Sequence, residues 1–123
     1  MEAFLTQPVL TPWDVFVLRH RKPANLAIHA VSFAMFYGGP LAALGAGDWR
    51  WMGLFLGSGL VGAFGHWVTG DGGVSVKEAS SSPWVVFYVT RMFLRMAQGR
   101  YGADIEAAVA RHNEACKHLD DVV

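Results

Sequence analysis

The sequence PANLAIHAVSFAMFYGGPLAALGAG at residues 23–47 is followed closely by WMGLFLGSGLVGAFGHWVTG at residues 51–70. Neither stretch contains an Asp, Glu, Lys or Arg. As a helix that rises about 1.5 Å per residue, each is long enough to cross a bilayer core of about 30 Å. A buried helical hairpin in a soluble domain is the alternative, but the rest of the chain has little apolar material to cover one. The two stretches therefore predict an all-α integral membrane protein built on two transmembrane helices.

The connector between these spans, residues 48–50, is so short that the two helices must run antiparallel as neighbours. Trp49 and Trp51 suit a membrane–water interface at this turn. The connector has one basic residue, Arg50, whereas the opposite ends of the spans are flanked by a larger set: Arg19, Arg21, Lys22, Lys77, Arg91, Arg95 and Arg100. The positive-inside rule then predicts that both termini lie in the cytoplasm.

Three further helices are predicted around this hairpin. Residues 12–21 form a short helix along the membrane surface, with Thr11 as its N-cap. Residues 83–98 are apolar at first and then carry two arginines four residues apart, which favours an interfacial or half-inserted helix over a full span. The pattern of apolar and charged side chains over residues 102–119 predicts a weakly amphipathic soluble helix. A Gly/Ser-rich loop over residues 70–82 separates the hairpin from the last two helices.

The composition narrows the classes of protein. The chain is 53% hydrophobic and 16% charged and its mean hydropathy is +0.28, so residues 1–123 are predicted to form a single membrane domain. Ten basic residues balance ten acidic ones, and no nucleic-acid-binding motif is present, which argues against a nucleic-acid partner. The single cysteine, Cys116, excludes an internal disulfide framework and a CxxC metal site. The first residues lack the basic start and apolar core of a secretory signal.

Polar side chains inside the apolar spans are the informative positions, because burying them unpaired in hydrocarbon is costly. His29 lies about 9 Å and His66 about 6 Å from the cytoplasmic ends of their helices, so an antiparallel hairpin brings both to a similar depth. Asn25 shares a helix face with His29, and His20, just before Pro23, can fold back over the same patch. Three imidazoles at one membrane surface suit a divalent metal ion such as iron, zinc or copper. The alternative is that each histidine is separately hydrogen-bonded to a carbonyl or hydroxyl group.

Small residues follow a helical spacing in the second span. Gly53, Gly57 and Gly65 lie at multiples of four residues, and Ser58 and Gly62 form an adjacent row. Such spacing lets another backbone approach closely in lipid. The pattern indicates helix packing and allows a homodimer through these small-residue faces.

The string HRKPANLAIH at residues 20–29 resembles the HxxxxNxxxH opening of a small membrane family whose fungal member is an iron-dependent 2-hydroxy-fatty-acid dioxygenase. Gly65-His66 is similar to the Gly-His pair that this family has at the end of a following span. The family's closing Pro-Trp, Arg-Met and Gly-Arg pattern is similar to three pairs in this chain: Pro83-Trp84, Arg91-Met92 and Gly99-Arg100. The likeness covers residues 18–100.

The resemblance implies an integral membrane protein that uses Fe(II) and O2 to remove C1 from 2-hydroxy fatty acids, a step of fatty-acid α-oxidation that gives the acid one carbon shorter. It maps the family's motif histidines to His20, His29 and His66 as metal ligands, with Asn25 orienting a histidine or a water. The implied partners are the bilayer and a fatty-acyl substrate. Interfacial basic residues would offset the charge of the substrate carboxylate, and the candidates are Arg19, Arg21 and Lys22.

The chain departs from the family after His66. Members usually carry a Glu four residues after this histidine, followed by a basic residue and a Pro, whereas this chain has Gly70 and, at the later position, Val74. Asp71 is the candidate replacement for that carboxylate, either as a ligand or as a partner of a ligand. The alternative is a solvated Asp that terminates the helix in a Gly-rich loop.

The leading hypothesis is a membrane-embedded Fe(II)-dependent dioxygenase of 2-hydroxy acyl chains, with a site formed by His20, His29, His66, Asn25 and Asp71. A haem-binding membrane electron carrier is the second hypothesis, in which His29 and His66 supply axial ligands across the hairpin. A non-catalytic helical membrane scaffold is the third. In that case the glycines pack helices and the histidines only form hydrogen bonds.

Overall fold

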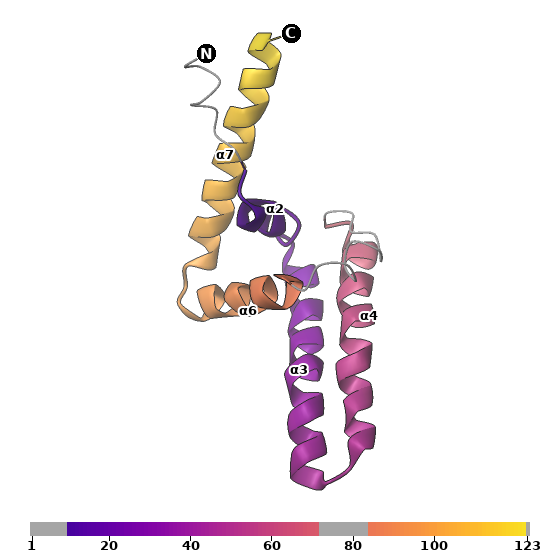
Figure 1. Ribbon diagram of the computed structural model, residues 1–123. Coiled ribbons are helices and arrows are strands. Elements are labelled where there is room, and N and C mark those ends of the chain that lie inside the picture. The colour runs from indigo at the N-terminus through magenta and orange to yellow at the C-terminus, as the bar shows by residue number, and fades with distance from the viewer. Residues whose placement is uncertain (1–9, 72–83, 123) are drawn as a thin grey trace.

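Helices make up nearly all of the chain that the computed structural model describes, which comprises residues 10–71 and 84–122 (Figure 1). No strand occurs in these residues, so the predicted all-α class is confirmed. The helices are α2 (Pro12–Leu18), α3 (Pro23–Ala46), the short 3-10 helix η1 (Trp49–Trp51), α4 (Met52–Thr69), α6 (Trp84–Ala97) and α7 (Tyr101–Val122). Most of the predicted Gly/Ser loop and most of the N-terminal segment that lacks the features of a secretory signal lie outside the described residues.

Helix α2 begins at a capping box. The Thr11 hydroxyl accepts a hydrogen bond from the Asp14 backbone N–H at 3.1 Å, and the Asp14 carboxylate accepts one from the Thr11 N–H at 2.9 Å. This reciprocal pair satisfies two N–H groups, and Pro12 at the first helical position has no N–H to satisfy. The helix ends at Leu18, earlier than the predicted residue 21. The chain must leave helical geometry before Pro23, because a proline ring disfavours that geometry in the residue ahead of it.

Helices α3 and α4 lie side by side and antiparallel, with their tight connection at the end remote from the other helices (Figure 1). Gly47 ends α3 in the left-handed conformation, with φ 64°, which a residue without a Cβ adopts without strain. The connection then passes through η1 into α4. The boundaries expected from the sequence, 23–47 and 51–70, differ from the observed ones by at most one residue.

Glycines allow these two helices to approach closely. A Cβ added at Gly39 would lie 2.8 Å from the backbone nitrogen of Phe55, and one at Gly65 would lie 2.5 Å from Oδ1 of Asn25. Gly53 belongs to the same predicted row as Gly65, yet a Cβ there would meet nothing within 4 Å. Most of the small-residue face therefore packs this hairpin internally. A homodimer through such faces stays a prediction.

A small hydrophobic core lies between α2, α6 and α7, outside the hairpin. It consists of Trp13, Phe16, Val17, Met92, Tyr101 and Ala108. Two ion pairs accompany it: Arg111 contacts Asp14 at 2.7 Å, which joins α7 to α2, and Arg95 contacts Asp104 at 2.6 Å, which joins α6 to α7. Helix α6 lies across α3 (Figure 1) and has only 14 residues, too few to span a bilayer core.

Helix α3 is the one helix in the described residues that is long and apolar enough to cross a membrane. Only 11% of its most apolar stretch is buried, so it differs from the core helix of a soluble domain, which is mostly buried. Leu41 and Leu44 on this helix are 68% and 83% exposed. Membrane crossing by the whole hairpin, α4 included, and the side on which the termini lie stay predictions.

Candidate metal centre

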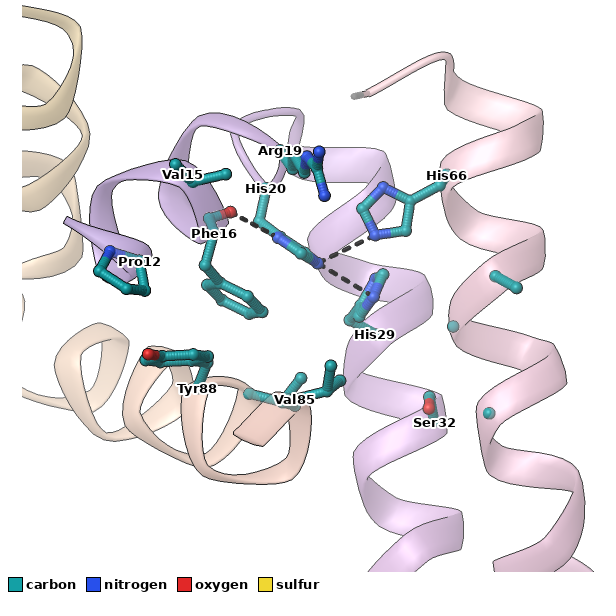
Figure 2. Close-up of a pocket in the computed structure, with 14 residues that line it drawn as sticks. Pro12, Val15, Phe16, Arg19, His20, His29, Ser32, His66, Val85 and Tyr88 are labelled. Atoms are coloured by element: carbon teal, nitrogen blue, oxygen red, sulfur yellow. Dashed lines mark hydrogen bonds between the residues drawn. The ribbon is translucent and has the colours of Figure 1, made fainter. Parts of the chain in front are cut away.

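Three histidines from three segments of the chain converge at the open end of the hairpin (Figure 2). His20 lies in the turn between α2 and α3, His29 lies on α3 and His66 lies on α4. Nε2 of His20 is 3.3 Å from Nε2 of His29 and 3.0 Å from Nε2 of His66. All three residues are buried, and each offers a ring nitrogen within 4.8 Å of the others. The structure thus brings together the same three histidines that the depth argument selected.

The other nitrogen of each ring faces a backbone carbonyl. His20 Nδ1 lies 2.7 Å from the Phe16 oxygen, His29 Nδ1 lies 3.0 Å from the Asn25 oxygen, and His66 Nδ1 lies 2.6 Å from the Asp71 oxygen. A carbonyl oxygen only accepts hydrogen bonds, so each Nδ1 must carry a proton and donate it. In a neutral imidazole whose Nδ1 is protonated, the Nε2 atom carries no proton and presents a free lone pair. Three such lone pairs point toward one another.

Neutral imidazoles in this arrangement repel, because no proton lies between their Nε2 atoms. Burial, together with the neighbouring His29, lowers the pKa of His20 to about 3, so a proton does not bridge the cluster from this ring at neutral pH. A cation held by the three lone pairs removes the repulsion. Metal-binding histidines commonly donate their second ring N–H to a carbonyl, which is the arrangement found at all three rings.

The spacing of the nitrogens fits ligation of one metal ion. Imidazole nitrogens roughly 2.1 Å from a tetrahedral ion stand roughly 3.4 Å apart, and the two closest Nε2 separations are 3.3 and 3.0 Å. The three buried histidines can therefore hold a metal ion. Imidazole ligands bind iron, zinc, copper and nickel, so the ligand type alone does not identify the metal.

The same geometry disfavours haem. The ring centroids of His29 and His66 are 4.9 Å apart, and His20 contacts both rings edge-on. Axial ligands must stand on opposite faces of a planar macrocycle, and the third imidazole occupies the region where that plane would lie.

Asp71 braces the cluster without joining the group of converging ligand atoms. Its carboxylate Oδ2 accepts hydrogen bonds from the backbone N–H groups of Arg21 and Lys22, at 2.8 and 2.7 Å, and from Asn25 Nδ2 at 3.2 Å. The Asp71 backbone carbonyl accepts a hydrogen bond from His66 Nδ1. Asp71 is 3% exposed, so it is not a solvated loop residue. One residue therefore joins the end of α4 to the turn that carries His20.

Asn25 orients His29 through its backbone. The Asn25 backbone carbonyl accepts a hydrogen bond from His29 Nδ1. The Asn25 side-chain amide donates hydrogen bonds to the Asp71 carboxylate and, at 3.5 Å, to the Arg19 carbonyl. Its Oδ1 is the buried side-chain oxygen without a hydrogen-bond partner among the described residues. The amide nitrogen of the side chain thus holds the turn, through Asp71 and the Arg19 carbonyl.

Two aromatic residues that the sequence did not single out fix His20. The Phe16 ring stacks on the imidazole, with centroids 4.0 Å apart and an interplanar angle of 19°. The Tyr101 hydroxyl donates to the His20 carbonyl at 2.7 Å, which ties α7 to the site. Phe16 precedes His20 by four residues, a helical spacing that could have indicated the contact, whereas Tyr101 lies 81 residues away.

A cavity of about 260 Å³ opens beside the cluster. His20, His29 and His66 form part of its wall, and Arg19 lies next to them (Figure 2). The rest of the lining is mainly apolar and comes from α2, α3, α4 and α6, with Phe16, Val85, Tyr88 and Val89 among its residues. The histidine cluster is thus accessible from an apolar pocket, and Arg19 is the cationic side chain among the described residues that line it.

These features define a class: an all-α protein with a buried three-histidine site that can hold a metal ion next to an apolar cavity. Compared with protein-family models, with curated proteins and with solved structures, the chain has no match.

Removing the Asp71 carboxylate is expected to weaken metal binding. Asp71→Ala leaves two backbone N–H groups and the Asn25 amide without their acceptor, and loss of such a supporting partner lowers metal affinity about 10–100-fold. Asp71→Asn keeps an acceptor oxygen and should lose less. Competition with a chromophoric chelator for Fe(II) and Zn(II) measures both variants, and an Asp71→Ala affinity equal to that of the wild type would contradict the bracing role.

Proposed function

We propose that this protein is a membrane-embedded, Fe(II)-dependent dioxygenase that removes C1 from 2-hydroxy fatty acids, like the family its sequence resembles. The observation that carries the proposal is the convergence of three Nε2 lone pairs, from His20, His29 and His66, at the wall of a largely apolar cavity. Three imidazoles suit iron and leave coordination positions for a substrate and for oxygen. An apolar cavity of this kind suits an acyl chain.

The proposed reaction balances with one O2 for each substrate molecule. R–CH(OH)–COOH and O2 give R–COOH, CO2 and H2O. The bond between C1 and C2 breaks, the two carbons together lose four electrons, and the O2 accepts all four. When bound, the iron supplies O2 activation and a Lewis acid for the hydroxyl and carboxylate oxygens.

Arg19 is the residue proposed to bind the substrate carboxylate. It lines the cavity beside the three histidines, and a guanidinium matches a carboxylate through two parallel hydrogen bonds. The other two candidates, Arg21 and Lys22, are not among the described residues that line the cavity.

The hairpin is proposed to sit in the bilayer with the metal centre near its cytoplasmic surface. Large apolar side chains on α4 are exposed as they are on α3, with Leu56 at 75%, Leu60 at 71% and Trp67 at 80%. Exposed apolar surface of this extent is typical of a membrane contact. The open end of the hairpin carries Arg19, Arg21 and Lys22, which favours the cytoplasmic side for that end and for both termini.

A turnover assay tests the proposal. Detergent-purified protein is loaded anaerobically with Fe(II), mixed with O2 and a carboxyl-labelled 2-hydroxy acid, and the products are analysed by mass spectrometry. We expect the acid one carbon shorter, labelled CO2 in equal amount, and equal consumption of O2. A series from 2-hydroxyoctanoate to 2-hydroxyhexadecanoate covers the range of chain lengths.

Matched controls make the assay specific. The 3-hydroxy and unsubstituted acids should remain intact, because they lack the hydroxyl group beside the carboxylate. His112→Ala, which changes an exposed histidine on α7, should keep the activity, and His29→Ala should lose it. Iron-loaded wild-type protein that converts no 2-hydroxy acid of any length would overturn the proposed function.

A further inference from the structure

The cavity beside the three histidines adjoins a second one. The second cavity has a volume of about 170 Å³ and shares four lining residues with the first: Ser32, Gly59, Val85 and Val89. From these it extends between α3, α4 and α6, past Phe33, Phe36 and Val86. The two adjoining cavities, together called here the tail channel, begin at the three histidines.

The walls of the tail channel offer few polar groups to an occupant. Its two serine hydroxyls already donate to backbone carbonyls, Ser32 to Ser58 at 2.6 Å and Ser58 to Phe55 at 2.7 Å. The rest of its lining consists mainly of aliphatic and aromatic side chains. The described lining therefore suits an occupant that is charged at the end where Arg19 and the histidines lie and apolar along the remainder.

A hydrogen bond between Tyr37 and Thr90 lies at the far end of the tail channel. The Tyr37 hydroxyl and Thr90 Oγ1 are 2.9 Å apart, and both residues line the second cavity. They also line a more open depression on its other side, together with Trp84 and Phe87. The pair thus forms a wall between the channel and this depression. His29 and Tyr37 are eight residues apart on α3 and so about 12 Å apart along the helix axis, close to the length of an extended decanoyl chain.

We infer that the tail channel binds the acyl tail of a fatty acid whose carboxylate lies at Arg19, and that the Tyr37–Thr90 pair limits the length of that tail. The inference rests on the proposed function for the identity of the head group. Its support is the match of charge at one end and of apolar lining along the rest. A medium-length chain fits within the wall, whereas a hexadecanoyl chain has to displace the pair.

Displacement of labelled decanoate tests the channel without turnover. Radiolabelled decanoate is bound to the metal-loaded protein in detergent and displaced by unlabelled decanoate or 2-hydroxydecanoate. A Cβ at Gly59 meets nothing within 4 Å, so Gly59→Phe should place its ring in the open channel and weaken displacement at least tenfold. Gly53→Phe, at an equally open position on the same helix and away from the channel, should leave it unchanged. Metal content equal to that of the wild type reports that both variants are folded.

The wall is tested by Tyr37→Ala. Opening it joins the depression to the channel, so the variant should bind hexadecanoate at least tenfold more tightly relative to decanoate than the wild type does. Unchanged decanoate displacement in Gly59→Phe, or unchanged chain-length preference in Tyr37→Ala, overturns the channel. If both variants respond as expected while no 2-hydroxy acid is converted, the proposed reaction fails and the channel stands.

Discussion

Alanine at His29 or at His66 is expected to strip the protein of its metal. Wild-type protein loaded with Fe(II) should retain close to one ion per chain after desalting, and each variant should retain less than a tenth of that. Losing a partner that merely supports a ligand lowers affinity about 10–100-fold, and each of these substitutions removes a ligand itself. His20→Ala should behave alike, because its Nε2 contacts both other rings, at 3.3 and 3.0 Å.

Metal analysis by mass spectrometry measures the loss. His112→Ala is the matched control, since this histidine is exposed on α7 and lies outside the cluster. A Soret band in the purified protein would instead favour the haem hypothesis. Retention of iron in both His29→Ala and His66→Ala would show that the imidazoles do not hold it and would leave the scaffold hypothesis.

The convergence of the histidines could be predicted because it depends on few facts. Two apolar helices joined by a short connector must run antiparallel, so the distance of His29 and of His66 from their helix ends determines their relative depth. The break before Pro23 then lets His20 return over them. Each step uses local sequence or a single contact between neighbouring elements, and the helix boundaries were right to within one residue for the hairpin.

The bracing of the site could not be predicted in the same way. Asp71 contacts Arg21 and Lys22 across about fifty residues, and the Tyr101 hydroxyl reaches the His20 carbonyl across 81. Such contacts depend on how α7 and the end of α4 pack against the α2–α3 turn. The hydrophobic periodicity of the sequence does not predict this packing. A buried Asp in a Gly-rich segment looks in sequence like a turn residue. Only the three donors around its Oδ2 identify it as a brace.

The glycine rows illustrate a partial success. Their spacing predicts close packing, but spacing alone does not distinguish a partner within the chain from a second copy. The contacts of α3 with α4 resolve this for Gly65, whose missing Cβ atom makes room for Asn25. Gly39, which lies outside the predicted rows, makes room for Phe55 in the same way. The contacts also separate Gly53, which faces open space, from the packed positions.

Gly65→Ala is expected to loosen the site without removing any of its ligands. The added Cβ would lie 2.5 Å from Asn25 Oδ1 and 3.1 Å from Ile28 Cγ2. The Asn25 side chain has little freedom to retreat, because its amide donates to Asp71 at 3.2 Å. Overpacking of this kind costs about 1–3 kcal/mol. Since α4 carries His66 one residue further on and Asn25 carries the carbonyl that orients His29, the two helices should separate and metal affinity should fall about tenfold.

The matched variant Gly53→Ala is expected to change stability in the opposite direction. An alanine is favoured over a glycine by up to about 1 kcal/mol inside a helix, and the Cβ at Gly53 meets nothing within 4 Å, so this variant should be as stable as the wild type or more so, with unchanged metal affinity. At Gly65 the same helical gain is outweighed by the contact with Asn25. Thermal unfolding in detergent and chelator competition measure both effects. Equal stability and equal metal affinity in Gly65→Ala and Gly53→Ala would mean that α3 and α4 do not pack at Gly65 as closely as the Asn25 contact requires.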